Sequence, residues 1–265
     1  MSLFKSPISI FQKDEYSHTI EIYDSIPKYV WNQKKNIHNT SNAIIIRKAK
    51  IRGKKFLIKI KPAIIEKKSF KTILIYPGAR EEIVEDALRK IAVHGGGEII
   101  HGKAGVTFTL YELQRELIRT GHGYNLNEIK ESIEVCRGST LEYMTKDKKI
   151  FISSSFFPLI GFTKKNINKK NNLKCFVQFN PLVNQSILNY SFKLYNYTAC
   201  MNIHSPFARY MYKRMSHYWI QAHPQSPYTP SLISFLNYSP RDLSNRMSEN
   251  IRAMKNTLQL LIKKK

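Results

Sequence analysis

The sequence predicts an α+β protein in which tandem winged helix-turn-helix domains follow an N-terminal region that carries a basic β-hairpin. Three observations predict this fold. Branched apolar residues alternate with lysine and arginine around Gly53, three amphipathic helical segments then precede a second hairpin, and a polar segment separates these elements from another set of helices. The predicted divisions are an N-terminal segment (1–75), a first winged-helix domain (76–163), a linker (164–174) and a second winged-helix domain (175–265).

The N-terminal segment contains the stretch "NAIIIRKAKIRGKKFLIKIKPAII", which is typical of a β-hairpin with Gly53 in its turn. The following "KKSFKTILIYPG" indicates one more strand before Pro77. The apolar face of the hairpin must pack against another part of the protein, whereas its basic face is free. The basic run from Arg47 to Lys61 fits a solvated hairpin face and a phosphate-gripping wing equally well.

The first domain has the element order of a winged helix-turn-helix. "REEIVEDALRKIAVH" carries acids in its first turn, where capping and the helix dipole account for them, and Gly95 ends it. The next two helices begin with capping boxes at Thr109 and Asn125, and Gly121 ends the first of these two. "TLEYMTKDKKIFISSSFFPLIGF" then predicts two strands around a turn, so that a hairpin follows three helices.

The second domain begins with the strand-like "KCFVQFNPLV". A helix follows in "SPFARYMYKRMSHYWIQA" with Pro206 in its first turn, and "YTPSLISFLNY" predicts a short helix. The last helix is expected to start at Ser239 as its cap, with Pro240 next and Asp242 completing a capping box. Its apolar stripe, expected to face the core, is Leu243, Met247, Ile251, Met254, Leu258 and Leu261.

The candidate DNA-binding residues lie on two predicted helices and one loop. Arginine, lysine, asparagine and serine side chains suit base edges and phosphates, and the alternative for each helix is a solvated face. On the last helix, the residues opposite the apolar stripe are Arg241, Asn245, Ser248, Arg252 and Lys255. In the first domain, where three glutamates dilute the positive charge, the candidates are Asn125, Asn127, Lys130, Arg137 and the loop residue Lys103.

The charge of the chain indicates a polyanionic partner. Lysine and arginine number 43 against 19 aspartate and glutamate residues, which gives a formal net charge of +24 spread along the whole chain. Such an excess is costly in a compact protein unless a polyanion neutralises it. No apolar run of about 18 residues, lipidation signal or signal-peptide core is present. We therefore expect a cytoplasmic protein that binds double-stranded DNA and no membrane.

The stretch "HGGGEIIHGKAGVTF" comes one residue short of a phosphate-binding loop of the G-x-x-x-x-G-K-[ST] type. Ala104 stands where the hydroxyl that holds Mg²⁺ is needed, and the stretch follows a helix rather than a strand. We expect a flexible basic connector, with a short strand at most at Val106–Phe108. A P-loop enzyme acting on DNA is the alternative, and binding of Mg-ATP would support it.

No other pattern predicts chemistry. The histidines form no H-x-H or H-x-x-x-H pair, no G-x-S-x-G is present, and the three cysteines are far apart, with Cys136 on an apolar helical stripe. We therefore expect no metal, no cofactor and no catalytic residue.

The stretches "YPGAREEIVEDALRKIA", "GVTFTLYELQRELIRTGHGYNLNEIKESIEVC", "KCFVQFNPLV" and "SPFARYMYKRMSHYW" together resemble plasmid replication initiator proteins of the Rep type. The resemblance spans about residues 76–262. It implies two winged-helix domains that bind repeated origin sequences (iterons) and recruit host replication proteins such as the replicative helicase and polymerase. It also implies that the last helix, Ser239–Leu261, reads the iteron, and that the first domain serves dimerisation as well as DNA contact. A winged-helix transcriptional regulator without an initiator role is the alternative.

Overall fold

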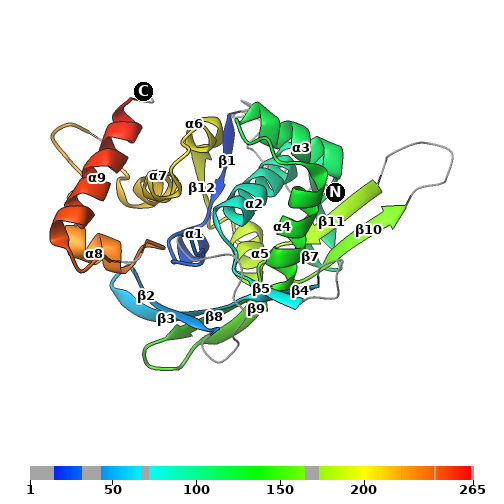
Figure 1. Cartoon of the computed structure of the whole chain (residues 1–265), viewed down its shortest axis with the longest axis horizontal. Helices are drawn as coiled ribbons and strands as arrows, with labels where there is room; N and C mark the ends of the chain where they lie inside the picture. The colour runs from blue at the N-terminus through cyan, green and yellow to red at the C-terminus, as the bar shows by residue number, and fades with distance from the viewer. Residues whose placement is uncertain are drawn as a thin grey trace.

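The computed structural model describes residues 15–31, 43–66, 72–164, 173–221, 223–241 and 243–263, and it shows a mixed α+β fold (Figure 1). The helices are α1 (Glu21–Asp24), α2 (Ala79–Ile91), α3 (Leu110–Arg119), α4 (Leu126–Gly138), α5 (Pro181–Leu188), α6 (Tyr197–Met201), α7 (Pro206–Tyr218), α8 (Leu232–Asn237) and α9 (Met247–Ile262). The strands are β1 (Tyr16–Thr19), β2 (Ile45–Ile51), β3 (Lys54–Lys61), β4 (Ala63–Glu66), β5 (Thr72–Ile75), β6 (Gly97–Ile100), β7 (Lys103–Thr109), β8 (Thr140–Thr145), β9 (Phe151–Ser155), β10 (Ile160–Lys164), β11 (Leu173–Gln178) and β12 (Lys193–Asn196).

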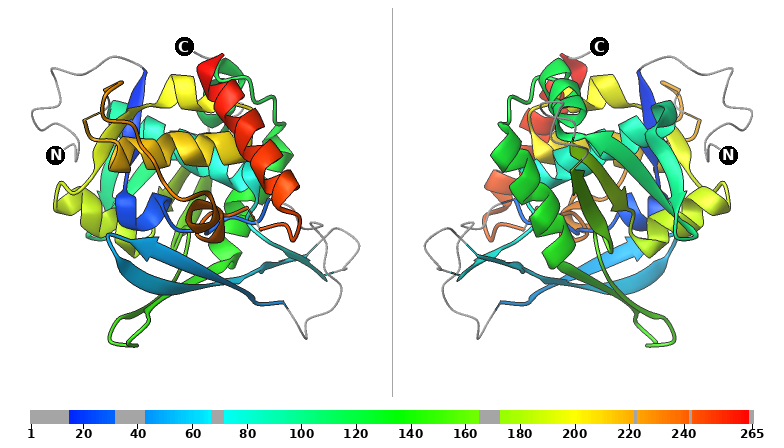
Figure 2. Two further views of the ribbon diagram at one scale, coloured as in Figure 1. Left: turned by 90° about the vertical axis from the view of Figure 1, so that its left-hand side faces the viewer. Right: turned by 90° about the vertical axis from the view of Figure 1, so that its right-hand side faces the viewer.

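Both predicted hairpins form, and they join into one four-stranded sheet in the order β2-β3-β8-β9. Arg52 and Gly53 make the tight turn of the first hairpin with positive φ angles of 45° and 81°. Strand β3 pairs antiparallel with β8, with Ile58 opposite Tyr143. The sheet curves beneath the helices, so its inner face is buried and its outer face is open to solvent (Figure 2). The sequence predicts the two hairpins but not their pairing.

A second four-stranded sheet, β10-β11-β7-β6, contains strands from both sides of the predicted linker. Strand β11 pairs antiparallel with β10 on one side and with β7 on the other. The middle of the linker, residues 165–172, lies outside the described residues. The division into two domains therefore remains a prediction, while strands on either side of it share a sheet.

The glycine-rich stretch is a β-hairpin, so the expectation of a flexible connector with little strand structure is wrong. After α2, one π-helical turn spans Ala92–Gly96, and Gly95 within it has a φ of 111°. Strands β6 and β7 then pair around a tight turn made by His101 and Gly102, whose φ angles of 48° and 74° suit a two-residue hairpin turn. A phosphate loop connects a strand to a following helix, and this stretch connects two paired strands.

The two capping boxes predicted in the first domain are present. Thr109 and Asn125 each accept a hydrogen bond from the backbone amide three residues later, and Glu112 and Glu128 accept one in return. These caps fix the starts of α3 and α4, which pack against α2 and against each other. Helix α2 is buried along nearly its whole length and forms the centre of the molecule.

One hydrophobic core runs through the three predicted parts of the chain. Buried side chains such as Tyr23, Leu88 and Tyr197 belong to the same cluster. The three cysteines are buried with free thiols, and Cys136 packs in this core as predicted. A smaller cluster around Phe207, Tyr210 and Phe235 lies between α7, α8 and α9 and supports the last helix.

Candidate nucleic-acid interface

Helix α9 presents a polar face to solvent opposite the side that packs on α7. Ser248, Arg252 and Lys255 are all exposed, and their spacing of four and three residues places them in one row along the helix. Asn250 and Thr257 are the residues of α9 that are buried. Three of the five residues predicted on this helix therefore share one accessible face.

The last helix begins at Met247, so the predicted start at Ser239 is wrong. The Ser239 hydroxyl contacts the carbonyls of Leu236 and Arg241 at 2.9 and 3.2 Å and closes the end of α8 instead of capping α9. The Asn250 amide holds the preceding loop: Oδ1 accepts from the Ser244 amide at 3.1 Å, and Nδ2 donates to the Ser244 carbonyl at 2.7 Å. If α9 began earlier, the backbone of Ser244 would be engaged within the helix, and the buried side-chain amide of Asn250 would lose its hydrogen-bond partners. Asp242 lies outside the described residues.

The late start of α9 separates two predicted residues from the row. Arg241 lies in the loop, where its guanidinium donates to Asn250 Oδ1 at 3.0 Å and lies 5.8 Å from the centre of the Phe207 ring. Asn245 is exposed in the same loop. These contacts hold Arg241 against the body of the protein, at the base of α9.

The expected apolar stripe of α9 is only partly buried. Met254 and Leu261 pack against the cluster beneath the helix, but Met247, Ile251 and Leu258 are each about two-fifths exposed, as is Leu243 in the loop. The stripe prediction is therefore wrong for these four residues. The physical reason is the rotation of the helix about its axis, which turns Asn250 and Thr257 inward. No periodicity of apolar residues could reveal a polar pair at the buried positions.

Helix α4 also has an exposed outer face, of mixed charge. Asn127, Lys130 and Arg137 are exposed on it, but Lys130 lies 3.9 Å from the Glu134 carboxylate and 5.7 Å from the centre of the Phe162 ring. Asn125 uses its side-chain oxygen to cap the helix at Glu128 N, 3.0 Å away. Lys103 is exposed beside the turn of the β6–β7 hairpin and is not part of this face.

The two candidate helices lie toward the same side of the molecule. In Figure 1, α9 lies on the left and α4 lies right of centre, and both views of Figure 2 place the two helices toward the side that faces the viewer in Figure 1. Residues from both could therefore face one extended partner.

The outer face of the β2-β3-β8-β9 sheet is a basic surface. From the sequence, this part of the chain fits a solvated hairpin face and a phosphate-gripping wing equally well. The lysines of this surface alternate with buried residues along the first two strands and are Lys48, Lys50, Lys55, Lys59 and Lys61. Glu142 on β8 pairs with Lys59 and Lys61, so the other three carry the surplus charge. Arg47 points elsewhere: its guanidinium donates to the carbonyls of Pro27 and Tyr29 and anchors the N-terminal segment.

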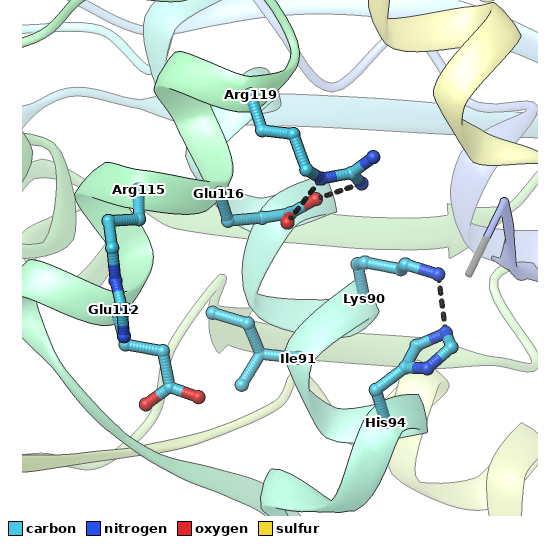
Figure 3. A pocket seen from close by; sticks show the side chains of 7 residues that line it. All are labelled: Lys90, Ile91, His94, Glu112, Arg115, Glu116 and Arg119. Carbon is cyan, nitrogen blue, oxygen red and sulfur yellow. Dashed lines mark hydrogen bonds and ion pairs between the residues drawn. The ribbon is translucent and has the colours of Figure 1, made fainter.

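A pocket between α2 and α3 gathers charges of both signs (Figure 3). Its volume is about 380 Å³, and it is lined by Lys90, Ile91, His94, Glu112, Arg115, Glu116 and Arg119. Arg119 makes two hydrogen bonds to the Glu116 carboxylate, at 2.8 and 3.0 Å, and Lys90 contacts His94 and the Tyr16 carbonyl. The two glutamates offset two of the three lysine and arginine side chains in the lining, so the pocket carries only a small net positive charge.

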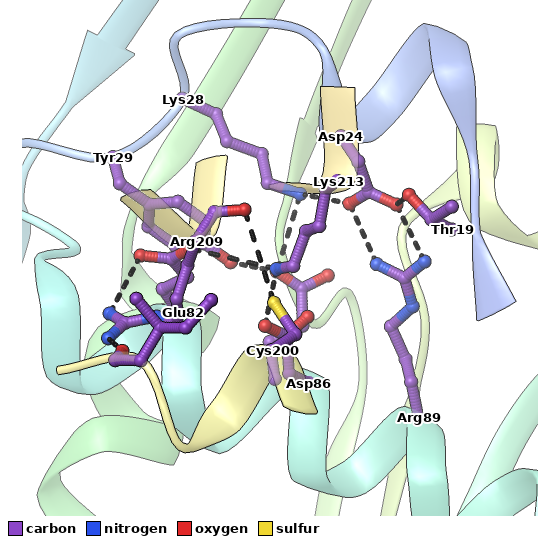
Figure 4. A network of polar contacts seen from close by, with 12 residues as sticks. Thr19, Asp24, Lys28, Tyr29, Glu82, Asp86, Arg89, Cys200, Arg209 and Lys213 are labelled. Atoms are coloured by element: carbon purple, nitrogen blue, oxygen red, sulfur yellow. Dashed lines mark hydrogen bonds and ion pairs between the residues drawn. The ribbon is translucent and has the colours of Figure 1, made fainter. Parts of the chain in front are cut away.

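A buried charge network, which the sequence did not predict, connects the supports of the two candidate helices (Figure 4). First-turn capping accounts for Glu81, whose carboxylate accepts from the Gly78 amide, but not for the other acids of α2. The four carboxylates are Asp24, Glu82, Glu85 and Asp86, and the four cations are Lys28, Arg89, Arg209 and Lys213. The acids of α2 recur at helical spacing, but the same positions are also compatible with a solvated face.

The network joins α1, α2 and α7. Arg89 donates to both oxygens of Asp24 at 2.8 Å, while Arg209 and Lys213 of α7 pair with Glu82 at 3.3 and 3.6 Å. Burial alone would raise the pKa of Asp24, but Arg89 and Lys28 hold that pKa well below its ordinary value. Because α7 carries α9 and α2 carries α4, these pairs fix the position of one candidate helix relative to the other.

None of the helices in the described part of the chain combines the length and the apolar character that a membrane span needs.

No family model matches the chain, and no curated protein matches it. Among solved structures, the chain is similar to domains 2 and 3 of RctB. A selenomethionine derivative of these domains is 9% identical with a TM-score of 0.43, over 67% of this chain and 64% of that one. A second structure is 11% identical with a TM-score of 0.46, over 74% of this chain and 70% of that one. The chain thus spans less than two thirds of the first of these structures.

Proposed function

We propose that the chain is a non-enzymatic, sequence-specific protein that binds double-stranded DNA and initiates the replication of a plasmid. The observation that carries the proposal is the row of Ser248, Arg252 and Lys255 on the open face of α9. An arginine can bind the major-groove edge of guanine through two hydrogen bonds, and lysine and serine suit phosphates or bases. The low number of acids on this helix, where Glu249 is the single carboxylate, suits the same partner.

The arrangement of the elements supports contact in two grooves. We propose that α3 and α4 form a helix-turn-helix with the β8–β9 hairpin as its wing, and that α9 is the reading helix of a second such unit. Helices α4 and α9 lie toward one side of the molecule, as contact with one duplex requires (Figures 1 and 2). The basic outer face of the sheet supplies lysines for the phosphate backbone. Recognition of origin repeats, dimerisation and recruitment of a host helicase belong to the same proposal.

An origin assay tests the initiator role. The gene and the DNA next to it are placed on a plasmid that lacks an origin, and the number of transformants is counted in a host that cannot replicate the vector. We expect replication from the wild-type gene and none from the double variant Arg252→Ala and Lys255→Ala, with Lys263→Ala as a matched cation control at the end of α9. Specific binding without replication in this assay would favour the transcriptional regulator instead.

A further inference from the structure

The largest of the hollows described lies at the turn ends of the two hairpins of the β2-β3-β8-β9 sheet. It is a groove of about 780 Å³ between these turns, α1 and α5, within the size range of small-molecule sites. In the left view of Figure 2, the turn end of the blue hairpin lies below α1 and α5. It lies on the inner side of the sheet and meets the outer lysine face at Lys55.

The floor of the groove is apolar. Phe56 and Tyr143 stack side by side with their ring centres 4.6 Å apart and line it from β3 and β8. The aliphatic side chains of the lining come from α1, β2, α5 and the second hairpin, and they are Ile22, Ile51, Ile150, Ile152 and Leu182. Of these, Ile150 is half exposed, so part of the apolar lining faces water. An apolar molecule in the groove would gain from covering it.

The rim of the groove is cationic. Lys54, Lys55, Lys146 and Lys149 line it, against a single acid, Asp147. The Asp147 carboxylate accepts hydrogen bonds from the Thr145 hydroxyl at 2.5 Å and the Lys149 amide at 3.2 Å, so it belongs to the turn between β8 and β9. The lysines therefore present a net positive edge to anything that enters.

One polar group in the lining has no partner. Within the described residues, the hydroxyl of Tyr143 is buried and makes no hydrogen bond, and a buried donor without a partner destabilises a protein. Burial raises the pKa of Tyr143, so the hydroxyl keeps its proton and can donate.

We propose that this groove binds an amphipathic carboxylate of small-molecule size. Its apolar body covers the floor, its anionic head lies among the rim lysines, and an acceptor atom of the ligand takes the hydrogen bond of the Tyr143 hydroxyl. Charge complementarity selects an anion over a neutral apolar molecule, and the apolar floor selects an amphiphile over inorganic phosphate. The site shares Lys55 and the β8–β9 turn with the surfaces proposed for DNA, but it requires no contact made by α9.

Fluorescence of 1-anilinonaphthalene-8-sulfonate, an aromatic anion, tests the proposal when dodecanoate is used as the competitor. We expect the wild-type protein to bind the dye and dodecanoate to displace it. Lys146→Glu should weaken dodecanoate binding by about fivefold or more, whereas Lys48→Glu, the same charge change on the outer face of the same sheet, should change it less than about twofold.

The variant Tyr143→Phe separates ligand binding from folding. Loss of a hydrogen bond to the bound anion should weaken dodecanoate binding by about tenfold, while the midpoint of urea unfolding should not fall, because the unpaired hydroxyl is removed. Failure of dodecanoate to displace the dye would overturn the proposal. Equal affinities of the Lys146→Glu and Lys48→Glu variants, or an unchanged affinity of Tyr143→Phe, would overturn it as well.

Discussion

Asp24 holds the N-terminal segment to the centre of the molecule. It accepts hydrogen bonds from the Ile20 amide at 2.7 Å, from Arg89 and from Lys28, and it is almost fully buried. A buried ion pair gains little relative to apolar packing, but removal of one partner leaves the other charge in a dry environment. Asp24 therefore helps to hold the N-terminal segment in place, together with the contacts of Arg47 to the carbonyls of Pro27 and Tyr29.

We expect Asp24→Asn to lower the free energy of unfolding by about 3–5 kcal/mol at neutral pH, because Arg89 and Lys28 lose their compensating charge. Urea unfolding followed by circular dichroism measures the change. The folded pKa of Asp24 is depressed, so its contribution is present above the pKa of the unfolded chain, near 4, and is lost as the pH falls below that value. Glu134→Gln, which removes a carboxylate on the partly exposed face of α4, serves as control and should change stability by less than about 0.5 kcal/mol. Equal effects of the two substitutions would contradict the role of Asp24.

His217 makes a second residue-scale prediction. Burial lowers its pKa from 6.5 to about 4, and Nε2 lies 3.0 Å from the Thr19 hydroxyl. Between pH 6.5 and 4, His217 is protonated in the unfolded chain but stays neutral in the folded chain. The free energy of unfolding is therefore undiminished above pH 6.5 and falls as the pH drops toward 4. We expect His217→Gln to remove up to about 3 kcal/mol of this pH-dependent loss. Unfolding curves at pH 7, 5.5 and 4.5 measure it, and parallel pH profiles of variant and wild type would refute the assignment.

At the scale of the elements, sequence patterns predict helices and strands whose signals are local. The capping boxes at Thr109 and Asn125 place α3 and α4 correctly, since a cap is a contact between residues three apart. The start of α9 is missed because a buried contact decides it: Asn250 binds the loop around Ser244, which prevents the Ser239 motif from opening the helix. The later start of α9 does not affect the row of Ser248, Arg252 and Lys255, because all three residues lie within Met247–Ile262.

Asn250 should therefore control the loop before α9. We expect Asn250→Ala to destabilise the protein by about 1–3 kcal/mol, because the Ser244 backbone and the Arg241 guanidinium lose their partner. Hydrogen exchange should quicken at residues 244–246 and remain unchanged in α4. Thr257→Ala, at the other buried polar position of α9, is the control for a general loosening of the helix. Exchange that quickens equally in both variants would contradict the specific role of Asn250.

At the scale of the whole molecule, the sequence does not predict which distant segments pair with one another. The union of the two hairpins in one sheet and the charge network between α1, α2 and α7 join residues far apart in the chain, and no local pattern encodes such a meeting. The net charge of +24, in contrast, needs no structure to predict its consequence. If the partner is duplex DNA, phosphate contacts release counterions, and affinity falls steeply with salt.

Fluorescence anisotropy measures whether the protein binds duplex DNA specifically through α9. A binding site is first enriched from a random duplex library, and dissociation constants are then measured for that site and a scrambled duplex at 50 and 200 mM salt. We expect about a thousandfold weaker binding at the higher salt for a protein that contacts six or more phosphates. Arg252→Ala should cost about 1–3 kcal/mol on the selected site and much less on the scrambled one. Equal losses on both duplexes, or an affinity that does not change with salt, would contradict the claim.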